Sequence, residues 1–371
     1  MILLDALIHT KMVGKCKYNN IEVVSMKKYR VAIVGLGRMA STIDQEVVDY
    51  PAITLPYSIA ASCQQIEKAE LVAGADILPE KLKAFGERWE VKALYEDYLE
   101  MIKQEEPDMV AICTKGEIHA EMAVKVAETG VPMMYVEKAM ACSMKEADVV
   151  LEACQNNNTL FNTGVLRRFD SRYHKAKELM DAGEIGQIKS IIHFGSTNLM
   201  HGHIHSIDTI MYLLGDPVAE SVWGELRPRS LEIKNNRLDK DPSAIYHIAF
   251  DNGTEAWTIP SGMWDFEIWG TGGSIRGMNN GIEWTIRKTY KINDKRAIFR
   301  ESTYPEYKAY SATAACLEDL IEAYEQKRPT LGNVEVTHRA TELCLAIAES
   351  HRTGKRVNLP LDNKELYVWH V

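Results

Sequence analysis

Short apolar runs alternate with amphipathic stretches along the chain from Arg30 to about residue 160. Four continuous apolar runs lie at 31–34, 71–75, 109–113 and 131–136. Runs of this length are typical of strands buried on both faces of a parallel sheet. The intervening patterns predict helices over 79–89, 95–104, 118–129 and 144–155. Alternating strands and helices of this kind predict an α/β domain with a parallel, doubly wound sheet.

The pattern changes after Gly164. A helix is predicted over 172–180, and strand-like runs follow at 188–194, 218–223, 245–250, 255–259, 266–269 and 282–286. Asp251-Asn252-Gly253 between two of these runs is a hairpin signal. Two more helices are predicted near 312–326 and 336–353. Strands without alternating helices predict an α+β domain, with a large, mostly antiparallel sheet covered by helices on one face.

The first predicted strand runs directly into a glycine-rich turn, Gly35-Leu36-Gly37-Arg38-Met39-Ala40. In this GxGxxA pattern Gly35 permits a tight turn, Gly37 lets the backbone approach a pyrophosphate, and Ala40 allows close packing of helix on strand. The position between a strand and a helix makes the pattern a predicted dinucleotide site of the Rossmann type, with Arg38 and Met39 inside the binding turn. A glycine turn that binds no nucleotide is the alternative.

Asp76 ends the second predicted strand, where a carboxylate can accept hydrogen bonds from ribose hydroxyls. It favours NAD over NADP, although Arg38 is near enough to bind a phosphate. Asp76 lies 36 residues beyond Ala40 instead of the usual spacing of about 20. We therefore expect an insertion, centred on residues 44–57.

These patterns divide the chain into three parts. We expect a poorly ordered N-terminal extension over residues 1–27, a Rossmann domain over 28–160, and a substrate-binding and oligomerisation domain over 161–371. The net charge of −9 and the scattered basic residues argue against nucleic acid and anionic membranes as partners. No apolar run approaches the length of a membrane helix. Seven cysteines without a CxxC pair are typical of reduced core thiols, so we expect a cytoplasmic protein.

Six later motifs, in order, resemble those of the Gfo/Idh/MocA oxidoreductase family. They are the Thr114-Lys115-Gly116 turn with His119, Glu137-Lys138-Ala139, the segment Gly164 to Asp170, Gly183-Glu184-Ile185-Gly186, His205 with Asp208, and Leu213-Leu214-Gly215. The resemblance extends from about Lys28 to Leu361. It implies a dehydrogenase whose cofactor is also contacted by Thr114, His119, Glu137 and Lys138.

The sequence departs from the family pattern at three places. Ala139 stands where most members have proline, and Thr114-Lys115-Gly116 replaces an ATPN-like turn. His201 stands where most members have an aspartate, four residues before the site histidine.

Hydride transfer from an alcohol carbon requires removal of the hydroxyl proton. Lys138 follows a predicted strand at the edge where α/β sheets bind ligands, so its ammonium can polarise a substrate oxygen. His205 is the candidate general acid/base, because imidazole titrates near neutrality. His201 is the candidate for orienting His205 or replacing part of the acid/base pair.

Other polar residues of the second domain are candidates for substrate binding. Arg167, Arg168 and Tyr173 can bind hydroxyls or a carboxylate, or instead pack the hinge. Asp208 is predicted at a helix start, where it can bind substrate or complement the helix dipole. His201, His203 and His205 together resemble a zinc ligand set, but no second motif accompanies them, and we expect no metal.

The leading prediction is an NAD(P)-dependent dehydrogenase or reductase, with NAD preferred, acting on a sugar, polyol or related cyclic alcohol. A redox-neutral enzyme of the same fold, using tightly bound NAD for transient oxidation during glycoside cleavage, elimination or isomerisation, is the alternative. A non-catalytic cofactor sensor is the third possibility. The second sheet is expected to pair subunits into a homodimer or homotetramer, with Trp223, Trp257 and Trp269 in or near the contact.

Overall fold

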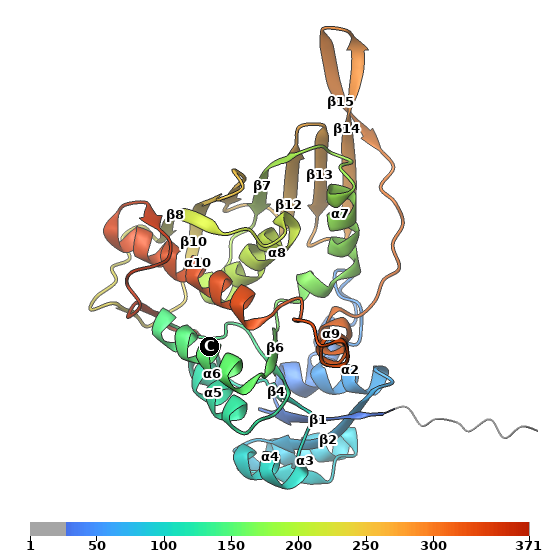
Figure 1. Ribbon diagram of the computed structural model, residues 1–371, viewed down its shortest axis with the longest axis vertical. Helices are drawn as coiled ribbons and strands as arrows, with labels where there is room; N and C mark the ends of the chain where they lie inside the picture. Colours follow the sequence, from blue (N-terminus) through green and yellow to red (C-terminus); the bar gives the residue numbers. More distant parts are fainter. Residues whose placement is uncertain (1–26, 371) are drawn as a thin grey trace, which may run out of the picture.

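The computed structural model describes residues 27–370, so the predicted extension over residues 1–27 lies, except for Lys27, outside the described residues. Two sheets organise the chain, a six-stranded one in the N-terminal part and a nine-stranded one above it (Figure 1). This confirms the predicted combination of a Rossmann-type α/β unit with an α+β unit.

The first sheet is parallel, with the strand order β3-β2-β1-β4-β5-β6. The order reverses beside β1, which is the arrangement that opens a ligand crevice at the carboxyl edge. The strands are β1 (Tyr29–Val34), β2 (Ala69–Ala75), β3 (Ala93–Tyr95), β4 (Met109–Ile112), β5 (Met133–Val136) and β6 (Leu160–Thr163). β1, β4 and β5 are almost wholly buried, because helices cover both faces of the sheet.

Alternate residues of these strands belong to two different cores. Val31 and Ile33 pack with α2, α3 and α9, whereas Ala32 and Val34 pack with α4, α5 and α6. The helices are α2 (Ile59–Gln65), α3 (Pro79–Trp89), α4 (Tyr98–Glu105), α5 (His119–Glu128), α6 (Met144–Asn157) and α9 (Ala312–Gln326). Because α9 comes from the C-terminal third of the chain, the last part of the sequence returns to complete the first core.

The connection from β1 to β2 contains the predicted insertion. It starts with a π-helical turn, η1 (Arg38–Thr42), and a single turn of helix, α1 (Asp44–Val47). A loop then leads to α2, and the Asp44 carboxylate closes it by accepting from the backbone nitrogens of Tyr57 (2.7 Å) and Ser58 (3.2 Å). The long regular helix expected after the glycine turn is therefore replaced by short pieces and a loop.

The second sheet has the strand order β15-β14-β13-β12-β7-β11-β10-β8-β16, in which β7 and β11 form the single parallel pair. Its strands are β7 (Ile188–Phe194), β8 (Ala219–Arg227), β10 (Ser243–Phe250), β11 (Glu255–Ile259), β12 (Asp265–Gly270), β13 (Gly273–Met278), β14 (Glu283–Asn293), β15 (Arg296–Ser302) and β16 (Val357–Asn358). The β14–β15 hairpin projects away from the rest of the molecule (Figure 1).

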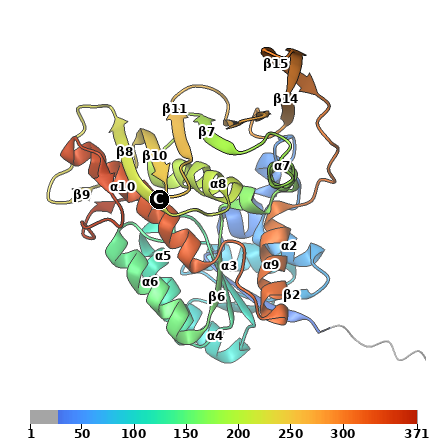
Figure 2. The ribbon, with the colours of Figure 1, turned by 45° about the horizontal axis from the view of Figure 1, so that its top comes forward.

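Helices cover one face of this sheet (Figure 2). They are α7 (Ser171–Asp181), α8 (Ile204–Leu214) and α10 (Val334–Thr353). Two short turns precede helices, η3 (Leu166–Phe169) before α7 and η4 (Leu199–His203) before α8. A small parallel pair, β9 (Arg237–Leu238) and β17 (Tyr367–Val368), brings the end of the chain back between the two sheets.

The six cysteines among the described residues are free, and five of them are buried. No helix in the described part of the chain combines the length and apolar character needed to cross a membrane.

Candidate functional site

The carboxyl edge of the parallel sheet is open above the glycine turn. Gly35 has a positive φ of 83°, and a Cβ there would lie 2.8 Å from the Cys113 carbonyl oxygen and the Thr114 methyl group. At Gly37, by contrast, no atom lies within 4 Å of the Cβ position. The backbone of Gly37 is therefore accessible to a ligand, which is what a pyrophosphate requires.

The Asp76 carboxylate lies beside this turn. Its Oδ2 accepts from the Leu36 backbone nitrogen at 2.8 Å, and its Oδ1 accepts from the Leu78 nitrogen at 3.0 Å. These bonds fix the carboxylate at the end of β2. Arg38 is directed to Glu46 of the insertion, with 2.6 Å between the charged groups, and Met39 follows it in η1.

The loops after β4 and β5 are joined by His119. Its Nδ1 lies 2.8 Å from the Ala139 carbonyl oxygen and its Nε2 lies 3.1 Å from that of Thr114. The imidazole is buried, and burial lowers its pKa. The His119 imidazole therefore contacts both loops.

Glu137 and Lys138 directly follow β5 at the same edge. Glu137 is buried and accepts from the Tyr135 hydroxyl, and Lys138 Nζ lies 3.9 Å from Glu137 Oε2. A side chain at Gly164 would collide with Glu137, so the neighbouring strand keeps room for this carboxylate. Lys138 is 15% exposed, which leaves its ammonium a restricted approach to the surface.

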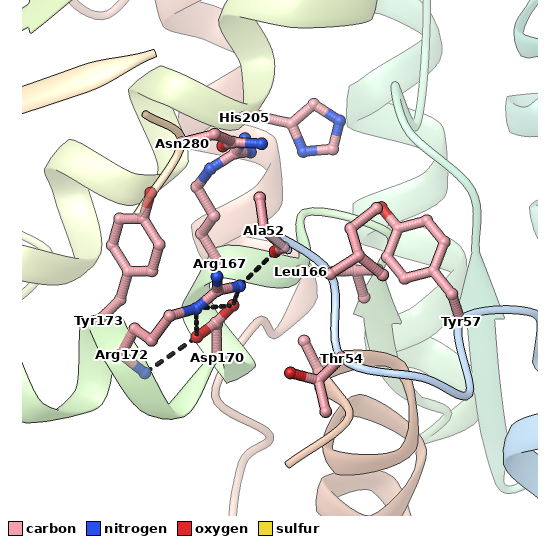
Figure 3. A pocket seen from close by; sticks show the side chains of 12 residues that line it. Ala52, Thr54, Tyr57, Leu166, Arg167, Asp170, Arg172, Tyr173, His205 and Asn280 are labelled. Carbon is pink, nitrogen blue, oxygen red and sulfur yellow. Dashed lines mark hydrogen bonds and ion pairs between the residues drawn. The ribbon is translucent and has the colours of Figure 1, made fainter. Parts of the chain in front are cut away.

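A pocket opens between the insertion, η3, α7 and the turn before β14 (Figure 3). It is lined by Ala52, Ile53, Thr54, Tyr57, Leu166, Arg167, Asp170, Arg172, Tyr173, His205, Asn280 and Ala312. The pocket joins both parts of the molecule, since 52–57 comes from the first and the other residues from the second.

His205 links this pocket to the sheet edge. Burial lowers the pKa of His205 well below its usual value, and the positive charge of nearby Lys138 lowers it further. The imidazole is therefore neutral at neutral pH, and its buried Nδ1 has no hydrogen-bond partner among the described residues. A neutral imidazole can accept a proton from a ligand in the pocket.

His201 is also close to Lys138. Partial burial first, and then Lys138, lower the pKa of His201 to about 4. Its backbone nitrogen donates to Asp241 Oδ2 at 2.7 Å. Its ring lies 5.4 Å from the ring of His370, whose Nε2 is 2.8 Å from the Lys138 carbonyl oxygen.

Two of the predicted substrate-binding residues, Arg167 and Tyr173, line the pocket. The other two, Arg168 and Asp208, do not. Arg168 is 1% exposed and forms ion pairs with Asp208 at 2.9 Å and with Asp216 at 2.8 Å. The charges of Arg168 and Asp208 are therefore paired inside the protein. Asp208 is also not at a helix start, because α8 begins at Ile204, and the expectation of a helix-dipole role is corrected.

The remaining pocket residues were not candidates from the sequence. Asp170 caps α7 and pairs with Arg172, and Arg172 also donates to the Ala52 carbonyl oxygen of the insertion. Asn280 lies in a turn with Asn279 and Gly281, all three with positive φ. The Asn279-Asn280-Gly281 sequence itself indicates a turn, but the position of this turn over the pocket depends on how the second sheet is oriented.

The three histidines between 201 and 205 diverge. His203 packs against Tyr246 and lies 3.2 Å from the Ser206 hydroxyl, in the interior of the second unit. Within residues 27–370, no group of three or more histidine, cysteine, aspartate or glutamate side chains is arranged to hold a metal ion.

Comparisons with known proteins agree with this arrangement. Residues 29–165 match the Gfo/Idh/MocA oxidoreductase family, NAD-binding Rossmann fold, and residues 189–359 match the C-terminal α/β domain of the same family. The scyllo-inositol 2-dehydrogenase (NAD(+)) of Bacillus subtilis is 28% identical over 91% of this chain and 98% of its own length. The myo-inositol 2-dehydrogenase of Thermotoga maritima is 24% identical over 52% of this chain and 56% of its own.

Solved structures share the fold. The aldose-aldose oxidoreductase from Caulobacter crescentus, complexed with glycerol, has a TM-score of 0.72 at 19% identity and covers 90% of this chain and 100% of its own. A levoglucosan dehydrogenase in complex with NADH has a TM-score of 0.70 at 20% identity, with the same coverage. With both family matches in sequence order over most of the chain, this protein belongs to the Gfo/Idh/MocA family of oxidoreductases.

Proposed function

We propose that this protein is an NAD-dependent dehydrogenase that acts on a CH–OH carbon of a sugar, polyol or related cyclic alcohol. The observation that carries the proposal is the placement of His205, which lines the pocket and is also close enough to Lys138 for the lysine to influence its pKa. In the proposed site, a proton acceptor and a cation therefore lie near one another, where the pocket adjoins the carboxyl edge of the sheet. The inositol 2-dehydrogenases among the relatives support the substrate class.

The residues at the sheet edge fit a dinucleotide. Gly35, Gly37, Arg38 and Met39 would lie along the pyrophosphate, and Asp76 would accept from the ribose hydroxyls. Thr114, Glu137 and Lys138 would border the nicotinamide end, with His119 supporting their loops. When bound, the nicotinamide supplies the acceptor or donor of the hydride.

His205 and Lys138 handle the substrate oxygen. In the oxidation direction, the neutral His205 imidazole accepts the hydroxyl proton as the carbon loses its hydride, and the Lys138 ammonium stabilises negative charge on that oxygen. In reduction His205 returns the proton. We further propose that residues 28–160 hold the cofactor and residues 161–371 supply most of the substrate contacts, with 52–57 reaching across.

Turnover measurements test this proposal. Incubation with NAD and a panel of sugars, inositols and other polyols is expected to give NADH with a ketone or lactone of matching mass. His205→Asn is expected to lower kcat by about 10²- to 10⁴-fold, the usual contribution of a general base. Lys138→Met should cause a similar loss together with weaker NAD binding. His351→Asn, on the far part of α10, is the matched control.

His201 is tested in the same assays. If it acts with His205, His201→Asn is expected to lower kcat nearly as much as His205→Asn, and the effects of the two changes in the double variant are expected to be less than additive.

Because the pKa of His205 is lowered, the acid limb of the kcat/KM profile is expected below pH 6.5. Unchanged single-turnover hydride transfer in His205→Asn would refute the role of His205, and product formation without net NADH would indicate the redox-neutral alternative.

A further inference from the structure

The walls of the pocket carry unequal charge. Two arginines, Arg167 and Arg172, and one aspartate, Asp170, line it. The Asp170 carboxylate is paired with Arg172, whose Nε lies 2.9 Å from Oδ1 and 3.1 Å from Oδ2. Arg167 makes no ion pair with any described residue. Its Nη2 donates instead to the neutral side-chain oxygen of Asn280, and its guanidinium lies 4.3 Å from the centre of the Trp264 ring.

Arg167 lies beside neutral groups of the pocket. Figure 3 shows its guanidinium beside Asn280 and below His205, which is neutral. The Tyr173 side chain lines the same pocket, is 1% exposed, and interacts with Arg167 through its hydroxyl. Among the described residues, the pocket therefore keeps one positive charge without an ion-pair partner, in a chain whose net charge is −9.

A half-buried cation without a counter-charge indicates a ligand that brings one. A guanidinium binds carboxylates and phosphates through paired N–H donors. A single arginine balances one negative charge, as in a carboxylate, whereas a phosphate monoester carries about −1.5 to −2 at neutral pH. The single unpaired charge of Arg167 thus favours a carboxylate.

We propose that the substrate is a sugar acid, a polyhydroxylated carboxylate whose carboxylate binds Arg167 while one of its hydroxyls lies at His205. This inference rests on the proposed function, because it names the substrate class of the same site. Asn280 holds the guanidinium in place without neutralising it, and its own Nδ2 donates to the Tyr50 hydroxyl at 3.0 Å. Through Tyr50 and Asn280, the insertion therefore helps to orient Arg167, the side chain proposed to bind the substrate carboxylate.

Matched substrate pairs test the proposal. The kcat/KM with NAD is measured for D-glucuronate against D-glucose, D-galacturonate against D-galactose, and D-gluconate against sorbitol. The wild-type protein is expected to prefer the acid of at least one pair by about tenfold or more. Arg167→Gln is expected to lower that acid-to-neutral ratio by about 100-fold, the scale of a lost charge-assisted pair.

A nearly isosteric variant separates charge from packing. Asn280→Asp keeps the shape but places a carboxylate beside Arg167, so it should also lower the acid-to-neutral ratio although the guanidinium is still present. Arg287→Gln removes the same charge from an exposed position on β14 and is expected to leave the ratio unchanged. Equal effects of Arg167→Gln on both members of every pair would overturn the proposal, as would a preference for neutral sugars or for glucose 6-phosphate.

Calorimetry distinguishes this inference from the proposed function. If no sugar is oxidised, binding of D-glucuronate, D-galacturonate and D-gluconate to the protein with NAD is titrated directly. Binding of one of them that is lost in Arg167→Gln supports the carboxylate site while the dehydrogenase proposal fails. Absence of both turnover and acid binding overturns the inference.

Discussion

Adjacent residues in this site have opposite surroundings. Arg167 and Arg168 follow one another in η3, yet Arg168 is buried between Asp208 and Asp216, whereas Arg167 faces the pocket beside a neutral amide. A buried charge is tolerated only when it is paired, so Arg168 is structural. The sequence offered no means of separating the two, because alternate positions of a short turn point in directions that depend on the elements it joins.

We predict that Asp76 decides the cofactor preference. Its carboxylate is fixed by the Leu36 and Leu78 nitrogens beside the open turn, Lys81 Nζ lies 3.7 Å from its Oδ2, and Arg38 is paired with Glu46. Because a 2′-phosphate would approach the Asp76 carboxylate, we expect NAD to bind at least tenfold more tightly than NADP, about 1.4 kcal/mol. Titration of both cofactors by tryptophan fluorescence measures this. Asp76→Asn should narrow the gap, and an equal affinity of the wild-type protein for both would contradict the prediction.

At the level of elements, the site depends on connections between segments that are distant in sequence. The insertion between η1 and α2 forms one pocket wall and is tied to α7 through Arg172. The end of the chain reaches the loop after β5, where Val368 N donates to the Cys142 carbonyl oxygen at 2.9 Å and His370 contacts Lys138. α8, which presents His205, is held to η3 by the Arg168–Asp208 pair. This ion pair therefore adds to the core packing that positions α8.

Removing Arg168 should weaken this attachment. Arg168→Met is expected to lower the free energy of unfolding by about 3–5 kcal/mol, because Asp208 would be left buried without its partner. Urea unfolding followed by circular dichroism measures the loss. The double variant Arg168→Met/Asp208→Asn should recover part of it, since Asp208 is then neutral and only Asp216, whose side chain is 26% exposed, is left without its partner. A loss below about 1 kcal/mol in the single variant would show that the pair does not anchor α8.

For the whole molecule, the apolar periodicity was sufficient to predict the two units, because buried parallel strands and a hairpin-rich sheet have different patterns. It did not reveal β6, whose buried Asn162 and Thr163 are polar, or β13, which contains three glycines or serines in six residues. It also did not reveal β3, whose last residue, Tyr95, was assigned to a helix that begins only at Tyr98. The motifs located Lys138 and His205, but the pocket also needs Asn280 and the insertion, and only tertiary packing brings those together.

The open face of the nine-stranded sheet leads to the last prediction, on assembly. Cross-strand pairing places Trp223, His247, Trp257 and Ile192 in one row on this face, opposite the helices. Trp223 is 37% exposed and Trp257 42% exposed, an apolar surface that is normally covered by a partner. We expect a homodimer or homotetramer that pairs through this face, and Trp257→Glu should shift it toward monomer in light scattering at micromolar concentration. Val149→Glu, on the exposed side of α6, is the control expected to keep the assembly. A wild-type monomer under these conditions would contradict the prediction, because the tryptophan row would then face solvent without a second subunit.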